Sequence, residues 1–214
     1  MLLALALGLV LLSLEVAGGL KIRQSYDQRQ FVGSVRLAGA FQTFRPSGRS
    51  GLSKPVGAGD LAADRSVRTE PAGCAPLTLL AVTTPLDGQS WTGINGSPAQ
   101  PVTILTVRYA DAGMARAGLR AKRLALLRCH TVRLTFPPFD QPAQTFTVHA
   151  PHPLLLTVSD HVSYALTGAQ RYEFYVRQYA NTLTWTYGDD VSAPGVRHQV
   201  ADSLIGRLRE LNQP

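Results

Sequence analysis

The uneven distribution of apolar residues is the feature that most constrains how this chain can fold. Residues 1–20 are almost wholly apolar, residues 21–71 are polar and rich in Gly, Ser and Arg, and dense strand-like patterning begins only near Cys74. A chain of 214 residues is long enough for one large domain or two small ones. Because the dense patterning is confined to residues 72–214, the sequence predicts one folded domain there.

The first twenty residues contain an apolar run from Leu2 to Leu14 with no charged side chain. Its thirteen residues match the core of a signal peptide better than a complete membrane span, which needs about 20 residues. We expect residues 1–20 to be a signal peptide or a single membrane anchor. Two features oppose export: basic residues are missing before the run, and Lys21 and Arg23 follow it. A buried core helix is the third interpretation of this run.

Residues 21–71 are predicted to be a flexible tether. The stretches 45–51 and 55–60 consist largely of Gly, Ser, Pro and other small or polar residues, so they offer little apolar surface to offset the entropy of ordering. Within this segment, a short strand across Phe31 to Phe44 can dock on the domain through Phe31, Val35 and Phe41.

The chain has two cysteines, Cys74 and Cys129, which are 55 positions apart and lie outside any Cys-x-x-Cys arrangement. In an exported chain two thiols usually pair. A disulfide that closes a loop of this size stabilises the fold by about 4 kcal/mol in the chain-entropy model. The alternative is two buried free thiols in a cytosolic protein, since cytosolic chains seldom carry disulfides.

The charge balance favours anionic partners. There are 21 basic and 14 acidic side chains, and the net charge is +7. For an exported protein such partners are phospholipid head groups, anionic wall polymers or acidic proteins. The chain shows no nucleic-acid-binding module, so we expect no nucleic-acid partner. It also shows no phosphate-binding or dinucleotide-binding loop, and no cofactor is expected.

The periodicity predicts an α+β domain, with a mostly antiparallel sheet covered by two amphipathic helices, one disulfide, and a preceding N-terminal hydrophobic segment. The expected strands are Leu77–Thr84, Val102–Tyr109, Thr131–Phe136, Gln144–His149, Leu154–Val158, Ser163–Leu166, Arg171–Tyr179 and Asn181–Tyr187. Turn-forming residues between Asp87 and Pro98 predict a loop that joins the first two strands. The last two strands are expected to form a hairpin.

The two predicted helices each have an apolar stripe. The first spans Asp111 to Arg128 and is capped by Asp111. Its stripe is Met114, Ala117, Ala121, Leu124 and Leu127, with Arg116, Arg120 and Arg123 on the other side. The second helix follows Pro194, has the stripe Val196, Val200, Leu204, Leu208 and Leu211, and is expected to cover the sheet. In the last strand, Leu183, Trp185 and Tyr187 alternate with Thr182, Thr184 and Thr186, which predicts one solvent-exposed face.

The order of these features over residues 72–211 resembles the extracellular sensor domain of PknH-type mycobacterial serine/threonine kinases, a domain that also occurs in stand-alone exported proteins. The shared features are Cys74 near the start, a Gly-x-x-Trp step from Gly88 to Trp91, a strand and helix leading to Cys129, an aromatic strand beginning at Asn181, and a terminal amphipathic helix. The family typically has a second disulfide, and these 214 residues contain neither that disulfide nor a kinase domain. The resemblance implies an actinobacterial-type α/β sheet domain with a ligand cleft.

Motifs for catalysis are missing from the sequence. It contains no Gly-x-Ser-x-Gly elbow, no phosphate-cradling loop and no His-Glu-x-x-His pair, so we expect a protein that is not an enzyme. His149, His152 and His161 have no recognised ligand spacing and are interpreted as surface histidines. Ser159-Asp160-His161 contains the residue types of a catalytic triad. Neighbours on a strand point to opposite faces and cannot form a catalytic relay, so we interpret this segment as a turn.

The expected ligand site consists of Trp91, Tyr109, Arg116, Arg120 and Arg123. Trp91 lies in the predicted loop, where binding residues are frequent, and the three arginines on one helix face can hold an anion. The alternatives are core packing of the aromatic residues and a solvated helix face. The predicted function is a non-catalytic, extracytoplasmic, ligand-binding or sensor-like domain of the cell envelope, attached to the cell membrane. The alternative is an envelope structural or assembly protein that acts through a protein–protein interface.

Overall fold

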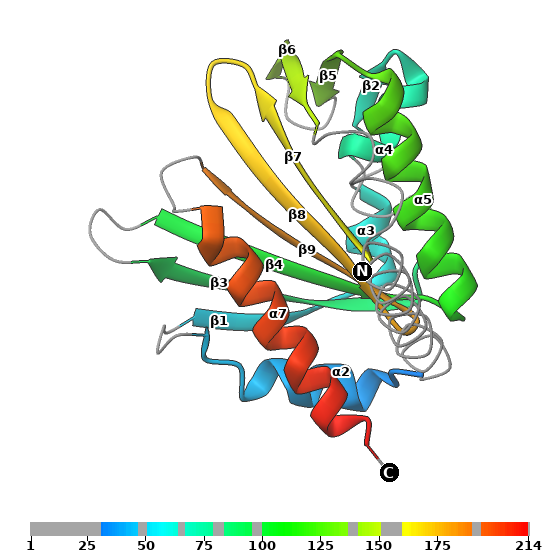
Figure 1. Cartoon of the computed structure of the whole chain (residues 1–214), viewed down its shortest axis with the longest axis vertical. Helices are drawn as coiled ribbons and strands as arrows, with labels where there is room; N and C mark the ends of the chain where they lie inside the picture. Colours follow the sequence, from blue (N-terminus) through cyan, green and yellow to red (C-terminus); the bar gives the residue numbers. More distant parts are fainter. Residues whose placement is uncertain are drawn as a thin grey trace, which may run out of the picture.

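A single nine-stranded antiparallel sheet forms the body of the protein, which we describe from a computed structural model (Figure 1). The structure describes residues 31–46, 51–63, 67–78, 84–95, 100–136, 141–150, 160–189 and 194–213. The strand order is β1-β3-β4-β9-β8-β7-β6-β5-β2. The α+β class and the mostly antiparallel sheet are therefore confirmed.

The sequence positions of the elements largely follow the predicted pattern after residue 100. The strands are β1 (Gly51–Val56), β2 (Arg68–Glu70), β3 (Asp87–Asn95), β4 (Gln100–Arg108), β5 (Thr131–Phe136), β6 (Gln141–His149), β7 (His161–Thr167), β8 (Arg171–Tyr179) and β9 (Thr182–Asp189). The helices are α2 (Ser34–Gln42), α3 (Ala58–Ala63), η3 (Ala72–Cys74), α4 (Ala75–Thr78), α5 (Ala112–Arg128) and α7 (Pro194–Leu211). The predicted hairpin is β8–β9, which pairs Tyr179 with Thr182.

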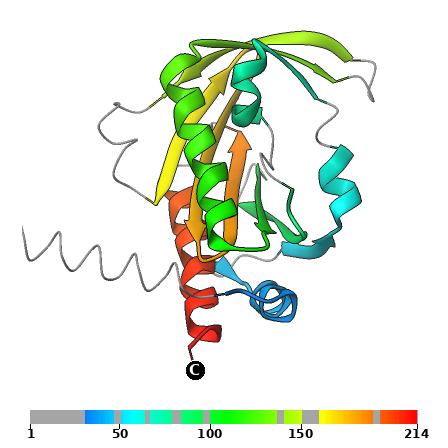
Figure 2. The same ribbon diagram turned by 90° about the vertical axis from the view of Figure 1, so that its right-hand side faces the viewer.

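The sheet separates two hydrophobic clusters, because alternate side chains of a strand point to opposite faces. On β4, Leu105 and Val107 belong to the cluster beneath α4 and α5, whereas Val102 and Ile104 belong to the cluster beneath α2 and α7. Figure 2 shows α5 along one face of the central strands. Both faces of the sheet centre are therefore covered.

The tether prediction is wrong for the described residues between 31 and 71. Helix α2 buries Leu37, Ala40 and Phe41, and β1 forms six residue pairs with β3. Helix replaces the expected strand because the apolar residues recur at three- and four-residue spacing. Phe41 docks as expected, but Phe31 and Val35 are exposed. The folded domain thus begins about forty residues earlier than the composition indicated, because a few well-placed apolar side chains were enough to order this segment.

The loop predicted between Asp87 and Pro98 is mostly strand β3, which ends at Asn95. Gly93 pairs with Gly51 of β1 in the ladder, and a Cβ at either position would come within 2.2 Å of the Trp91 ring. The ring therefore covers both glycines, which explains turn-type residues inside a strand. The strand predicted at Leu77–Thr84 is also wrong at its start, because Leu77 and Thr78 are in α4, and residues 79–83 lie outside the described part.

Helix α5 is confirmed, and the Asp111 side chain accepts a hydrogen bond from the Met114 N–H at 2.9 Å. Its buried stripe differs from the prediction. The buried residues are Ala115, Gly118, Leu119, Lys122, Ala125 and Leu126, whereas Leu124 and Leu127 are exposed. The prediction missed this buried face because it contains Lys122 and Gly118, which are not apolar side chains. Lys122 donates to the Pro76 carbonyl at 2.5 Å and lies 5.1 Å from the Trp185 ring centre.

The threonine face of β9 is buried, contrary to the prediction of a solvent-exposed face. Thr182, Thr184 and Thr186 have no exposed surface, because α7 packs over them. Their hydroxyls bond within the core: Thr184 with Thr106 at 2.9 Å, and Thr186 with the Arg197 carbonyl at 3.3 Å. Threonine therefore serves here as a small β-branched core residue. In α7 itself, Val200, Leu204 and Leu208 are buried as predicted, while Leu211 is 37% exposed.

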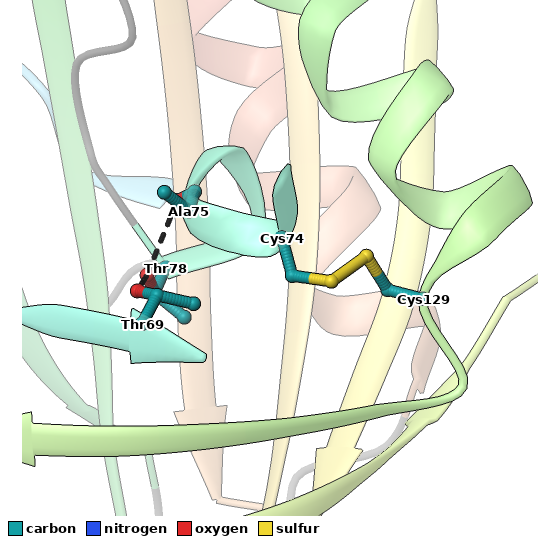
Figure 3. Close-up of a disulfide and its surroundings, with 5 residues drawn as sticks. All are labelled: Thr69, Cys74, Ala75, Thr78 and Cys129. Carbon is teal, nitrogen blue, oxygen red and sulfur yellow. Dashed lines mark hydrogen bonds between the residues drawn. A yellow bond between two sulfur atoms is a disulfide. The ribbon is translucent and has the colours of Figure 1, made fainter. Parts of the chain in front are cut away.

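The disulfide between Cys74 and Cys129 is present, with Cα atoms 6.0 Å apart (Figure 3). It joins η3 to the residue that follows α5, and so fixes the end of α5 against the short helices before β3. The expected segment 1–20 and the expected strand Leu154–Val158 lie outside the described residues. Among the described helices, none has the length and hydropathy needed to cross a membrane.

Candidate functional site

A cavity of about 300 Å³ lies between the first turn of α7 and strands β7 and β8. Its side walls come from one face of the sheet, since Ser163 pairs with Tyr175 and Ala165 pairs with Glu173 across β7 and β8. The lining residues are His149, Ala150, Ser163, Tyr164, Ala165, Arg171, Glu173, Phe174, Tyr175, Arg197 and His198. This volume is at the lower end of the range for small-molecule sites.

One wall of the cavity is charged. Glu173 forms ion pairs with Arg171, at 3.1 Å, and with Arg197 of α7. The Arg197 side chain is only 2% exposed, so it contributes a desolvated cation. Burial, together with the charge of Arg171, lowers the pKa of Arg197. The arrangement gives the cavity fixed, water-poor hydrogen-bonding groups that can orient a polar ligand.

The lining beside these charged groups is aromatic. The His198 ring lies over the Tyr175 ring with centroids 4.2 Å apart, and His198 Nε2 lies 3.2 Å from Ser163 Oγ. Burial, with the charges of His161 and Arg197, lowers the pKa of His198. Burial and the neighbouring Asp202 carboxylate raise the pKa of Tyr175. Both side chains are therefore neutral at pH 7 and present an uncharged aromatic surface to the cavity.

An ion-pair network fixes α7 beside this wall. Arg177 of β8 bonds to Asp160, with Nε–Oδ2 at 3.2 Å, and to Asp202 of α7. Burial raises the pKa of Asp160, but the hydrogen bond from His161 and the charge of Arg177 outweigh this and lower it. The Asp202 carboxylate also accepts a hydrogen bond from Tyr175 at 3.4 Å. The network thus connects the sheet to α7 next to the cavity.

Ser163 and His198 form a pair of the type found in nucleophilic sites, but the geometry of the third member differs. In the described residues, the nearby Asp202 carboxylate bonds to Arg177 and Tyr175. A catalytic triad needs that carboxylate on the second imidazole nitrogen. In the alternative trio Ser159-Asp160-His161, His161 is the first residue of β7 and its Nδ1 atom is 3.1 Å from Asp160 Oδ1, while Ser159 lies outside the described residues. Asp160 and His161 therefore do not point apart, contrary to the prediction.

The predicted site residues do not form one cleft. Trp91 and Tyr109 are both fully buried and belong to the clusters on opposite faces of the sheet. Trp91 packs edge-on against Phe44 of the α2 segment, with centroids 5.4 Å apart. Arg116 and Arg120 are exposed on α5, on the Tyr109 side, so the structure separates Trp91 from the arginine-bearing helix. The expected loop position of Trp91 was the source of this error.

Arg123 differs from the other two arginines because it is partly buried. Burial lowers the pKa of Arg123, and the charge of Asp160 opposes this shift. Its Nε and Nη2 atoms are buried without a hydrogen-bond partner among the described residues. His149 and His161 lie at the end of β6 and the start of β7, and His152 lies outside the described residues. Among the residues that the structure describes, no three His, Cys, Asp or Glu side chains are grouped to hold a metal ion.

Sequence reasoning missed Arg171, Glu173, Arg197 and His198. A signal was present on β8, where Arg171, Glu173, Tyr175 and Arg177 alternate with apolar or aromatic residues at period two. Four polar side chains on one face of a strand indicate either solvent or a polar site. The contribution of α7 had no such signal, because Arg197 reaches the strand only through the tertiary fold.

In its overall layout the fold resembles that of a known mycobacterial extracellular domain. It is similar to the crystal structure of the extracellular domain of PknH from Mycobacterium tuberculosis, with a TM-score of 0.55 and 12% sequence identity over 84% of this chain and 93% of that chain. This confirms the predicted resemblance as a weak match of layout. At this identity the likeness concerns the fold alone.

A second solved structure, the Rv0999 ortholog from Mycobacterium smegmatis, aligns with a TM-score of 0.41 and 14% identity over 81% of this chain and 95% of that chain. A score this low supports no conclusion. No protein-family model matches the chain, and no curated protein matches it.

Proposed function

We propose that this protein is a non-catalytic, extracytoplasmic binding domain of the cell envelope, attached to the membrane through residues 1–20, and that its ligand occupies the cavity between β7, β8 and α7. The observation that carries the proposal is the cavity itself, which combines an ion pair of the buried Arg197 with a neutral aromatic surface beside it. Ligand sites typically combine apolar surface with a few fixed polar groups.

Two further observations support the location. The disulfide joins Cys74 and Cys129, and such bonds persist in oxidising compartments. The PknH domain of similar fold is described as extracellular. The non-catalytic role is supported by the engagement of Asp202 with Arg177 and Tyr175, which leaves Ser163 and His198 without an orienting carboxylate in the described residues.

The test is native mass spectrometry of the full chain, extracted gently from its native membranes. We expect a retained non-covalent ligand. Ala165→Phe should abolish retention, because Ala165 is 4% exposed and lines the cavity. Thr145→Phe, an exposed site on β6, is the matched control and should retain the ligand. Equal retention by both variants would place the ligand elsewhere. Labelling of Ser163 by a fluorophosphonate would contradict the non-catalytic assignment.

A role in envelope assembly is the second candidate, and the outer side of α5 favours it. Leu124 and Leu127 are 42% and 45% exposed, and the exposed Arg120 and Arg128 lie on either side of them in sequence. Exposed apolar residues bordered by charge are typical of protein interfaces. Arg116, Arg120 and Arg123 remain proposed contacts for an acidic partner on this helix. Cross-linking from a photoreactive residue at position 124 in native membranes tests this role. Cross-linking to a partner protein that is lost in Leu127→Ser would support it.

A further inference from the structure

The described chain begins at one end of the sheet, which we call the proximal end. The Val32 N–H donates to Asn181 Oδ1 at 2.7 Å, and Asn181 lies in the turn between β8 and β9. Asn181 Nδ2 donates to the Tyr109 carbonyl at 2.8 Å, and Tyr109 comes two residues before Asp111, the cap of α5. The proximal end therefore combines residue 32, the β8–β9 turn and the start of α5 (Figure 1).

Two large apolar side chains are exposed at the proximal end. The Phe31 ring lies 6.0 Å from the Arg108 guanidinium, and the Leu86 N–H donates to the Arg108 carbonyl at 2.7 Å. Both residues are thus next to Arg108, although they are 55 positions apart in sequence. Phe31 is 51% exposed and Leu86 is 47% exposed. Exposed apolar groups bordered by charge indicate a protein or membrane contact.

The charges at the proximal end favour an anionic surface. Acidic side chains near this end are engaged within the domain. Asp87 forms a two-point ion pair with Arg108, at 2.9 and 2.6 Å, and Asp111 caps α5. Asp160 pairs with Arg177, and Asp60 accepts a hydrogen bond from the Gly57 N–H at 3.0 Å. Arg116 and Arg120 are exposed in the first half of α5, a helix with no acidic residue between 112 and 128.

The Arg116 guanidinium lies toward the start of α5. Its Nη2 atom is 3.8 Å from the position of a Cβ built at Gly113. The Asp111 carboxylate is at the same place, since its Oδ1 atom is 2.9 Å from that position. The Arg116 side chain is exposed, so its guanidinium is accessible to an anionic partner outside the domain.

We propose that the proximal end docks on the surface of an anionic phospholipid bilayer, with Phe31 and Leu86 in the interface and Arg116 and Arg120 at lipid phosphates. The inference rests on the membrane attachment in the proposed function. Whatever their conformation, the eleven residue steps from Leu20 to Phe31 span at most about 40 Å. An apolar run held in a bilayer therefore keeps Phe31 close to that bilayer, and combined apolar and cationic groups are the chemistry that binds anionic membrane surfaces.

Docking in this way would orient the ligand cavity. On β8, Tyr179 is at the proximal end, whereas Tyr175 and Arg171 of the cavity are four and eight residue steps away, about 14 and 27 Å along the strand. The cavity would then face away from the bilayer, toward molecules of the envelope.

The experiment uses the full chain reconstituted in vesicles, with tryptophan quenching by brominated lipids as the measure of membrane contact. Phe31→Trp places a probe at the proximal end, and Leu127→Trp places a matched probe in the last turn of α5, at a similarly exposed leucine. Trp91 and Trp185 are at most 1% exposed, so the wild-type chain gives the background. In vesicles containing phosphatidylglycerol, we expect quenching of Phe31→Trp at least about twofold above Leu127→Trp.

The charge contribution is tested in the same assay. Arg116→Gln and Arg120→Gln should each lower the ratio of docked to undocked molecules about fivefold, whereas Arg128→Gln at the other end of α5 should leave it unchanged. Purely phosphatidylcholine vesicles should remove the difference between these variants. Equal quenching of the two probes in a chain that floats with the vesicles would overturn the docking alone. Failure of the full chain to float with any vesicle would overturn both the docking and the attachment.

Discussion

The side chain of Asn181 holds the backbone of Val32, a residue 149 positions earlier in the chain. Asn181 Oδ1 accepts the Val32 N–H at 2.7 Å, and Asn181 Nδ2 lies 3.4 Å from the Val32 carbonyl, so the amide replaces a strand partner. Asn181 has no exposed surface. This contact joins the start of the segment preceding β1 to the domain, in addition to the buried apolar side chains of α2.

Replacing Asn181 by Ala should therefore destabilise the protein by about 3 kcal/mol, because it leaves the Val32 N–H and the Tyr109 carbonyl without their buried partner. The measurement is urea unfolding of the full chain, with hydrogen exchange to locate the change in α2. Ser90→Ala is the control, since its exposed hydroxyl makes one long bond to the Lys54 carbonyl, of 3.3 Å. A loss below about 1 kcal/mol would mean that α2 is held by its apolar contacts alone.

Reduction of the Cys74–Cys129 disulfide should lower the free energy of unfolding by about 4 kcal/mol, because it releases a loop of 55 residues in the unfolded state. Urea unfolding of the protein with both cysteines replaced by serine measures this loss. Intact mass before and after reduction supplies the control, with a gain of two hydrogen atoms expected, one on each sulfur. Alkylation of both cysteines without reductant would contradict the disulfide.

Substitution of Gly93 by Ala should destabilise the fold by about 1–3 kcal/mol, because the new Cβ would lie 1.9 Å from the Trp91 ring and force it out of place. Thermal unfolding followed by tryptophan fluorescence measures both the loss and the ring movement.

Gly39→Ala in α2 is the matched control, since nothing lies within 4 Å of its added Cβ. It should stabilise the helix by about 0.5–1 kcal/mol. A stabilising effect of Gly93→Ala, like that expected of Gly39→Ala, would show that the packing of Trp91 does not depend on the glycines.

His198 should titrate below the usual value for histidine, because burial and the charge of His161 lower its pKa. A lowered pKa in the folded state means that the unfolded chain binds the proton first. The contribution of His198 to stability is thus fully present above about pH 6.5 and declines as the pH falls through its folded-state pKa.

The check on this prediction is an NMR titration of the imidazole signals, assigned with His198→Gln. In that variant the decline of stability below pH 6.5 should be smaller. A midpoint of His198 at or above 6.5 would contradict the described packing against Tyr175.

Local patterns predicted the second half of the domain well, because β5, β8 and α5 have clear periodicity and bounding residues. They failed where tertiary contacts replace local signals. Lys122 is buried because Pro76 and Trp185 meet its ammonium group, and the glycines of β3 are strand residues because Trp91 covers them. Neither fact is visible in a window of ten residues.

The contribution of α7 to the candidate site could not be predicted from the sequence for the same reason. Glu173 and Arg197 are 24 positions apart, on a strand and a helix whose relative placement is set by the sheet. By contrast, the helix that carries Arg116 and Arg120 could be predicted, because charge and helical spacing are local properties. What could not be predicted was that Trp91 would lie on the other side of the sheet from this helix.

The strand order has a consequence for how the chain acquires its structure. The first two strands in sequence, β1 and β2, are the two outermost strands of the sheet, and they pair with β3 and β5. When a ribosome or export channel releases the chain from its N-terminus, residues 51–70 emerge before either neighbour exists. The two edge strands therefore pair only after β3 and β5 have been released, and the sheet assembles from its centre outward. This pairing of distant segments is slow relative to helix formation.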